Sequence, residues 1–289
     1  MDPTSSIPAA LAILVALITC FILVDKFGPP DEQGRFLAID GLRGYLAFCV
    51  FLHHSIIWYF YLKTDKWVVP PSNLYTHFGQ TSVAFFFMIT GFLFYSKILD
   101  GKKREIDWLR IYVSRFLRLT PLYFIAVSAL LLIVFALSGA EFHESVGVLA
   151  LEIIRWMSFT IFGVPDINGI ERTKIILAGV TWSLPYEWFF YLLLPGFAFI
   201  NRVRVGWVYL VVSVAAVILI FFKGTSPYHW LSFSGGVTAA YLVRHDFICE
   251  ILRKRISSFA AILLIALPIY LYPTAYGLIR VSALEHHNG

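Results

Sequence analysis

The chain has 289 residues, of which 59% are hydrophobic and only 14% are charged, and its formal net charge is +5. Soluble domains carry about 25% charged residues, so this composition excludes an ordinary soluble domain and indicates a protein that crosses the membrane several times. The basic residues cluster in short loops between apolar runs, so the positive charge indicates membrane orientation and not nucleic-acid binding.

Apolar runs along the chain predict an all-α, polytopic membrane bundle of about eight to ten transmembrane helices. The first run covers residues 7–25, and its flank MDPTSS lacks the basic residues of a signal peptide, so we expect an uncleaved anchor helix. Further runs cover residues 44–62, 81–97, 119–138, 185–200, 206–222, 229–243 and 257–276. Several are shorter than the ~20 residues of a perpendicular span, so we expect their helices to extend into the neighbouring loops.

Loop charges predict the orientation of these helices. Residues 97–118, 202–204 and 244–255 are rich in lysine and arginine, so the positive-inside rule places them in the cytoplasm. Residues 139–146 contain neither lysine nor arginine and are expected outside. This arrangement puts residue 43 at the cytoplasmic surface.

The apolar segment 147–163 leaves two interpretations open. It carries Glu152 and Arg155 three residues apart, on one face of a helix. It fits either a ninth span or a re-entrant helix that lines a cavity. If it does not cross, residues 164–182 lie outside together with residues 139–146.

We expect three regions along the chain. Residues 1–30 hold the anchor helix and a linker, residues 31–280 form the membrane domain, and residues 281–289 form a tail. The letters LEHH in the tail fit either the remnant of an expression tag or a native end, and we expect no function for His286 and His287.

Arg43 and His54 are the first candidates for a functional site, because both stand in the apolar run IDGLRGYLAFCVFLHHS. Their separation of eleven residues is about three helical turns, so they share one face roughly 16 Å apart, whereas His53 points about 100° away. Ionisable groups at this depth usually mark a reaction site or a pathway. A histidine suits a general base, and a surface arginine suits a phosphate. The alternative is an arginine that reaches the membrane surface and a histidine hydrogen-bonded to a neighbouring helix.

Three further segments contain notable residues. Arg115 and Arg118 in SRFLRLTPLY stand three residues apart at the mouth of a span, where they fit either a phosphate clamp or a plain cytoplasmic flank. Glu187 in TWSLPYEWFFYLLLP stands among aromatic residues, and we expect it to face a cation, an imidazole or a hydroxyl, because an unpaired carboxylate in lipid is too costly. Gly79 and Gly91 in GQTSVAFFFMITGFLFYSKI suit close helix packing.

Together and in this order, these segments resemble the acyltransferase-3 family of integral membrane acyltransferases over roughly residues 36–245. FLAIDGLRGYLAFCVFLHH is similar to the family's first-helix signature, a basic residue ahead of a histidine, which falls on Arg43 and His54. SVAFFFMITGFLF is similar to its FFxxSGF segment, with Thr90 where serine is usual. SRFLRLTPLY is similar to its basic cytoplasmic motif, TWSLPYEWFFYLLLP to its tryptophan-serine-leucine/glutamate segment, and FSGGVTAAYL to a later glycine-containing helix.

The resemblance implies a membrane O-acyltransferase that moves an acyl group, commonly acetyl, from cytoplasmic acyl-CoA to a hydroxyl. The implied acceptor is a carbohydrate or glycolipid of the cell envelope, and the implied location is a bacterial inner membrane. The CoA phosphates would dock against Arg115, Arg118 and Arg43, and the thioester would approach His54. His54 would either take the proton of the acceptor hydroxyl or carry the acyl group as an acyl-imidazole, and Glu187 would orient the imidazole or the hydroxyl.

Two departures from the family pattern stand out. An additional anchor helix precedes the signature helix, and the chain stops earlier than the family's usual ten-helix domain, so we expect a C-terminally short domain. No metal is expected, because Cys20, Cys49 and Cys249 lack the spacing of a metal site.

Two other classes of function remain in competition. In a transporter or flippase, Arg43, His54 and Glu187 would line a path for a solute or an envelope precursor. Many transporters have an inverted repeat, and none is visible here. A scaffold without catalytic activity is the third hypothesis, but the short loops give it no support.

Overall fold

The computed structural model describes residues 3–29, 37–101, 105–264 and 267. Contacts between Cα atoms divide the chain into two compact units, residues 1–89 with 241–289, and residues 90–240. Each unit is described by itself. The described residues are mostly helical and contain no β-strand beyond an isolated bridge between Ile167 and Ile170. The all-α fold class is therefore confirmed.

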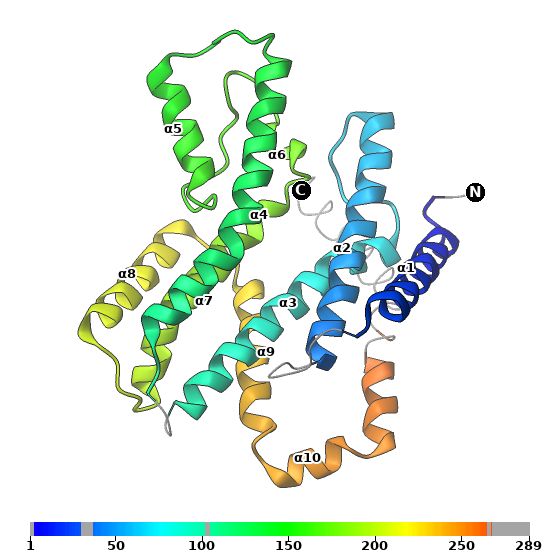
Figure 1. Cartoon of the computed structure of the whole chain (residues 1–289), viewed down its shortest axis with the longest axis vertical. Helices are drawn as coiled ribbons and strands as arrows, with labels where there is room; N and C mark the ends of the chain where they lie inside the picture. The colour runs from blue at the N-terminus through cyan, green and yellow to red at the C-terminus, as the bar shows by residue number, and fades with distance from the viewer. Residues whose placement is uncertain (1–2, 30–36, 102–104, 265–266, 268–289) are drawn as a thin grey trace, which may run out of the picture. The chain divides into compact units, whose positions relative to one another are not determined.

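Helices of different lengths make up both units (Figure 1). In the first unit they are α1 (Ser6–Phe27), α2 (Leu37–Thr64), most of α3 (Asn73–Asp100), α10 (Asp246–Leu252) and a helix over Arg255–Leu264. In the second unit they are α4 (Trp108–Leu137), α5 (Val146–Met157), α6 (Thr173–Ile176), the 3₁₀ helix η1 (Val180–Ser183), α7 (Leu184–Ile200), α8 (Trp207–Lys223) and most of α9 (Pro227–Leu242).

Among the described helices, α1 to α4 are long and apolar enough to cross a membrane. The runs predicted at 44–62 and 81–97 lie within helices of 28 residues each, and the run at 119–138 falls in a helix of 30 residues that ends at Leu137, so the expected extension into the loops is confirmed for these three runs. Helices α7, α8 and α9 are found where spans were predicted, but they have only 17, 17 and 16 residues, so the expected extension is not found there. The run predicted at 257–276 is helical as far as residue 264, and most of its remainder lies outside the described residues.

The ambiguous segment 147–163 forms α5, a helix of 12 residues, followed by turns. A helix of this length rises about 18 Å, well short of the ~30 Å hydrocarbon core of a bilayer. The structure therefore favours a helix that does not cross. The expected boundary at residue 30 and the tail 281–289 lie outside the described residues and stay predictions.

Side chains at the start of α3 pack α1, α2 and α3 together in the first unit. Tyr75 is 1% exposed and forms an apolar cluster with Ala9, Leu52 and Ile56. Its hydroxyl donates a hydrogen bond to the Ser5 carbonyl at 3.3 Å. The N-terminal end of α1 is thereby attached to the helix pair that carries the histidines.

Close contacts also fix α7 in the second unit. Helix α7 packs along α8 (Figure 1), where the Gly196 N–H donates to the Ser213 hydroxyl at 3.2 Å. Phe190 of α7 stacks on Phe233 of α9, with ring centroids 4.4 Å apart. These contacts set the positions of the residues at the beginning of α7.

The segment between α5 and α7 is irregular but strongly hydrogen-bonded. Trp156 is fully buried, and its indole N–H donates to the Pro165 carbonyl at 2.9 Å. The Asn168 side chain donates to the Glu141 carbonyl at 2.8 Å and accepts from the His143 N–H at 2.9 Å. These bonds hold the segment against the α4–α5 connection.

Candidate functional site

Helix α2 carries Arg43 and His54 on one uninterrupted run of helix. The predicted separation of about three turns on one face therefore holds in the structure. Both side chains are half-buried. This part of the candidate site belongs to the first unit.

His53 joins α2 to α3. Its Nδ1 lies 2.7 Å from the Tyr75 carbonyl oxygen, and because a carbonyl can only accept, His53 donates this hydrogen bond from a protonated Nδ1. The α3 backbone passes close to the ring at Gly79, where a Cβ atom would lie 2.5 Å from the His53 Cδ2. Gly79 is therefore required for this approach, as expected of a glycine that allows close helix packing.

His54 is held differently from its neighbour. The two imidazole rings meet edge to face, with centroids 5.0 Å apart. The His54 Nδ1 is buried and has no hydrogen-bond partner within the described part of the chain. A buried polar atom without a partner costs about 1–3 kcal/mol. The His54 Nδ1 shares this state with five other buried side-chain atoms of the described residues, among them the indole nitrogens of Trp108 and Trp188, so the catalytic role of His54 stays a prediction.

In the second unit, Tyr191 connects Glu187 to Arg115. Its hydroxyl donates to the Glu187 carboxylate at 3.3 Å and is also hydrogen-bonded to the Arg115 side chain. The Tyr112 hydroxyl donates to the Tyr191 carbonyl at 3.2 Å and so attaches α4 to α7. The expected hydroxyl partner of Glu187 is thus present.

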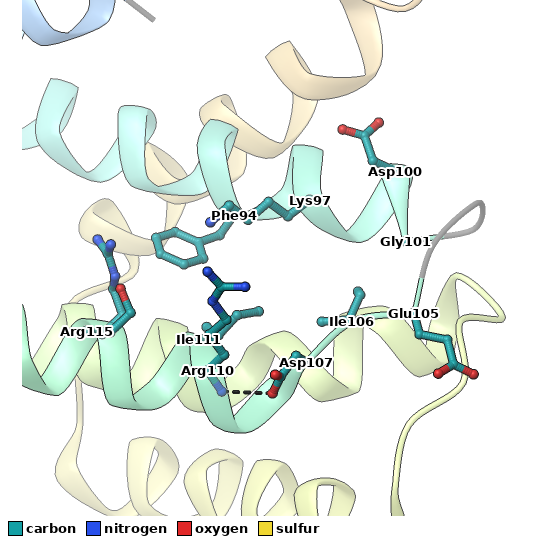
Figure 2. A pocket seen from close by; sticks show the side chains of 11 residues that line it. Phe94, Lys97, Asp100, Gly101, Glu105, Ile106, Asp107, Arg110, Ile111 and Arg115 are labelled. Carbon is teal, nitrogen blue, oxygen red and sulfur yellow. Dashed lines mark hydrogen bonds between the residues drawn. The ribbon is translucent and has the colours of Figure 1, made fainter. Parts of the chain in front are cut away.

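A cavity of about 580 Å³ lies where α3 ends and α4 begins (Figure 2). Its cationic residues are Lys97, Arg110 and Arg115, and its other lining residues are Phe94, Asp100, Gly101, Glu105, Ile106, Asp107, Ile111 and Ser114. Figure 2 shows the three cations near Phe94 and the acidic residues toward the connection between the helices. Asp107 caps α4 by accepting the Arg110 N–H at 2.9 Å, which places Arg110 in the first turn.

The cations of this cavity gather around one aromatic ring. The Lys97 ammonium lies 5.3 Å and the Arg115 guanidinium 5.2 Å from the centroid of Phe94, which is 5% exposed. Cation–π attraction supports both contacts. The positive charges of Arg110 and Arg115 act on Lys97, so an anion in the cavity would relieve a mutual repulsion.

A protein-family model described as an acyltransferase domain, acyltransferase-3, matches residues 36–288. The chain belongs to this acyltransferase family. No curated protein and no solved structure matches it. The family and the four long apolar helices make the protein a membrane acyltransferase, and the resemblance seen in its motifs is confirmed.

The acyltransferase brings some of the predicted site residues together. Arg43 and His54 share α2, and Arg115 meets Glu187 through Tyr191. Arg118, one turn along α4 from Arg115, is exposed and is not among the residues that line the cavity. The catalytic and binding roles of these residues stay predictions.

Sequence reasoning missed the contributions of Lys97, Arg110 and Tyr191, and it missed the hydrogen bond by which His53 joins α2 to α3. The first two were noticed only as charges that mark a cytoplasmic loop, and nothing in their spacing shows that they share a cavity with Arg115. The signal for Tyr191 was its position four residues after Glu187, which puts both on one face of α7. The signal for His53 was the glycine at position 79 in the next span.

Each unit by itself offers groups that suit acyl transfer. In the second unit the cavity offers cations for phosphate groups, and in the first unit the His54 Nδ1 has no hydrogen-bond partner among the described residues. The described residues hold no group of three or more histidine, cysteine or acidic side chains that could bind a metal ion.

Proposed function

We propose that the acyltransferase moves an acetyl group from cytoplasmic acetyl-CoA to a hydroxyl of a cell-envelope carbohydrate. The observation that carries this proposal is the gathering of Lys97, Arg110 and Arg115 on one cavity. Coenzyme A carries a pyrophosphate and a ribose phosphate at one end, and these groups match several cations at close spacing.

Cavity size and predicted orientation support the same donor. A volume of about 580 Å³ lies within the roughly 300–1,000 Å³ of common ligand sites. The cavity is built around the connection between α3 and α4, within the basic segment 97–118 that loop charges place in the cytoplasm, where acyl-CoA is made. Arg118 and Arg43 are further candidates for contacts with the donor.

Acyl transfer is assigned to His54. In one route the imidazole takes the proton of the acceptor hydroxyl, the oxygen attacks the thioester carbonyl, and CoA leaves as a thiolate that is then protonated. In the other route the imidazole itself displaces CoA, and the acceptor hydroxyl then displaces the imidazole from the acyl group. The second route moves an acyl group across the membrane without moving CoA.

We assign Glu187 the role of orienting either the acceptor hydroxyl or the imidazole of His54. One of its oxygens already accepts the Tyr191 hydroxyl. The carboxylate can accept further hydrogen bonds, so it can orient the hydroxyl of the acceptor or the imidazole.

Mass spectrometry of envelope glycans tests the proposal. Cells with the intact gene, without the gene, and with His54→Ala are compared. We expect glycans heavier by acetyl groups in the first cells only. Identical glycans in all three, with a solute whose uptake or export depends on the gene, would replace the enzyme by the transporter hypothesis.

The two routes are separated with purified protein. Radiolabelled acetyl-CoA without acceptor should leave label on the chain, and on a peptide that contains His54, only in the acyl-imidazole route. Transfer to an added acceptor without any labelled protein intermediate identifies the general-base route.

A further inference from the structure

Five ring-bearing side chains form a cluster where η1 leads into α7 and where α9 begins. We call this cluster the aromatic platform, and its members are Trp182, Tyr186, Tyr228, His229 and Trp230. The His229 ring lies at its centre, with centroids 4.7 Å from Trp182, 4.8 Å from Tyr186 and 5.4 Å from Tyr228. A polar ring is thus surrounded by three aromatic ones within a single compact unit.

Hydrogen bonds hold the aromatic platform in place. The Tyr186 hydroxyl accepts the Ser226 N–H at 3.0 Å, which ties the connection between α8 and α9 to α7. The Trp230 indole donates to the Thr225 hydroxyl at 2.8 Å in the same connection. A rigid set of rings loses little conformational entropy when a ligand binds.

Two rings of the platform are open at the surface. Trp182 is 41% exposed and Tyr228 is 55% exposed, while His229 between them is half-buried. The surface therefore combines flat apolar faces with an imidazole and a phenolic hydroxyl. Rings with an apolar body and a polar tip are the usual lining of sites for ligands that have both characters.

Along η1 and α7, the aromatic platform and the contact with the cationic cavity lie on opposite sides of Glu187. Trp182 lies in η1, just before α7 begins, and so precedes Glu187, whereas Tyr191, which is hydrogen-bonded to Arg115, follows Glu187 by about one turn of α7. Because α5 is too short to cross, the loop charges predict that residues 164–182 lie outside. Donor and acceptor would then approach Glu187 from opposite ends of α7.

We infer that the aromatic platform binds a sugar ring of the acceptor carbohydrate on the outer side. The C–H face of a pyranose is apolar and stacks on an exposed aromatic face, and the hydroxyls at its edge reach His229 and Tyr228. This inference rests on the proposed function, because it gives the carbohydrate acceptor its subsite. A scattered set of interfacial rings would anchor the protein in lipid instead, and the experiment separates the two.

The test uses the full chain in nanodiscs, labelled acetyl-CoA, and envelope polysaccharide from the native cells that has been deacetylated with mild alkali. Trp182→Ala and Tyr228→Ala should each raise the KM for polysaccharide about tenfold, the loss expected from one stacking contact. The affinity for acetyl-CoA should not change, and Trp182→Phe should keep most of the wild-type KM. Trp207→Ala, which removes another exposed tryptophan (74%) at the start of α8, is the matched control.

An unchanged KM in both platform variants overturns the inference. Equal losses of yield in Trp182→Ala and Trp207→Ala with unchanged KM identify lipid anchoring and overturn it as well. If the wild-type chain transfers nothing to polysaccharide, the proposed function fails, and the platform is tested by binding of fluorescently labelled polysaccharide. Binding that Trp182→Ala abolishes then supports the platform, and absence of binding to the wild-type chain refutes it.

Discussion

The surroundings of His54 in the first unit contrast with those of Glu187 in the second. Glu187 accepts a hydroxyl that is itself hydrogen-bonded to Arg115, so the carboxylate belongs to a connected polar network. The buried Nδ1 of His54 has no partner in the described structure, although its neighbour His53 is fully engaged with α3. The Glu187 carboxylate is thus held in place by hydrogen bonds, whereas the predicted reactive nitrogen of His54 is not.

The difference helps to distinguish residues that take part in the reaction from residues that stabilise the fold. A satisfied network stabilises an arrangement, and its loss should weaken binding or folding by a moderate amount. An unsatisfied nitrogen lowers stability in the resting protein, so its removal should be tolerated by the fold but not by the reaction.

The largest effect is expected from His54→Ala. It should lower acyl transfer by at least about a hundredfold, the usual contribution of a general base, while protein abundance and acetyl-CoA binding stay near wild-type. Glu187→Gln should lower transfer only about tenfold, because the amide oxygen can still accept the Tyr191 hydroxyl. Transfer of labelled acetyl groups by purified protein measures both.

His53→Ala is the control for this first prediction. It removes the bond to Tyr75 and should lower the thermal unfolding temperature more than it lowers transfer per folded molecule. A chain that needs His53 for transfer and works without His54 would reverse the assignment of the two rings.

A smaller effect is expected from the cations of the cavity. Arg110→Ala, Lys97→Ala and Arg115→Ala should each weaken acetyl-CoA binding about ten- to a hundredfold, because a hydrogen bond to a charged group contributes about 1.5–3 kcal/mol. Isothermal titration calorimetry at two salt concentrations measures the affinity for acetyl-CoA. The difference in affinity between wild type and variant should be smaller at high salt. Arg155→Ala removes an exposed arginine outside the cavity and should leave binding unchanged.

Arg118→Ala shows how far the donor site extends. A loss of acetyl-CoA affinity as large as that of Arg115→Ala would mean that the phosphate site includes Arg118, one helical turn beyond the cavity. Wild-type binding would limit Arg118 to marking the cytoplasmic flank. If all four variants bind normally, the donor is held elsewhere.

Gly79→Ala should affect folding and not donor binding. The new methyl group would lie 2.5 Å from the His53 ring, so the ring or the helix must move, at a cost of about 1–3 kcal/mol in unfolding free energy. Gly41→Ala meets nothing within 4 Å and should stabilise α2 by about 0.5–1 kcal/mol. Thermal unfolding in detergent compares them, and equal shifts in both variants would mean that α2 and α3 are not in close contact at this point.

The smallest effect concerns Glu152 of α5. Burial raises the pKa of its carboxyl, and the neighbouring Glu144 raises it further, against the lowering by the Asn168 N–H and by Arg155. A folded-state pKa above the unfolded value favours the protonated form, so this stability is present at low pH and lost as pH rises through the folded pKa.

Glu152→Gln keeps an acceptor for the Asn168 N–H, which lies 3.2 Å from the carboxylate in the wild type. The unfolding temperature of the wild type should therefore fall relative to that of this variant as pH rises above about 4.5, the ordinary pKa of a glutamate. Glu171→Gln, an exposed site, should follow the wild-type curve. A wild-type unfolding temperature that rises relative to that of Glu152→Gln over this range would contradict the raised pKa.

The fold could be predicted largely because apolar runs determine where helices are. Their ends could not, since α3 begins at Asn73 within a polar stretch that hydropathy assigns to a loop. Backbone hydrogen bonds and packing by Tyr75 extend that helix, and neither is visible as hydrophobicity. Hydropathy also could not decide whether the segment that forms α5 crosses the membrane, because its apolar residues suit both a transmembrane span and a short buried helix.

The candidate site was predicted only where its residues lie on one helix. Arg43 with His54 follows from periodicity alone, and the hydroxyl next to Glu187 lies one turn away on α7. Lys97 belongs with Arg110 and Arg115 because α3 and α4 return to the same cavity, and this depends on the angle between two helices. Sequence spacing carries no information on such an angle.

The irregular segment between α5 and α7 has a consequence for local opening. Asn168 adopts a left-handed backbone (φ 52°) that suits asparagine, and it joins the segment to Glu141 and His143. Thr173 is fully buried and donates its N–H to Asp166 at 2.9 Å. Amide protons here should exchange with solvent as slowly as those of a packed helix, and proteases should cut the segment poorly although it contains almost no helix.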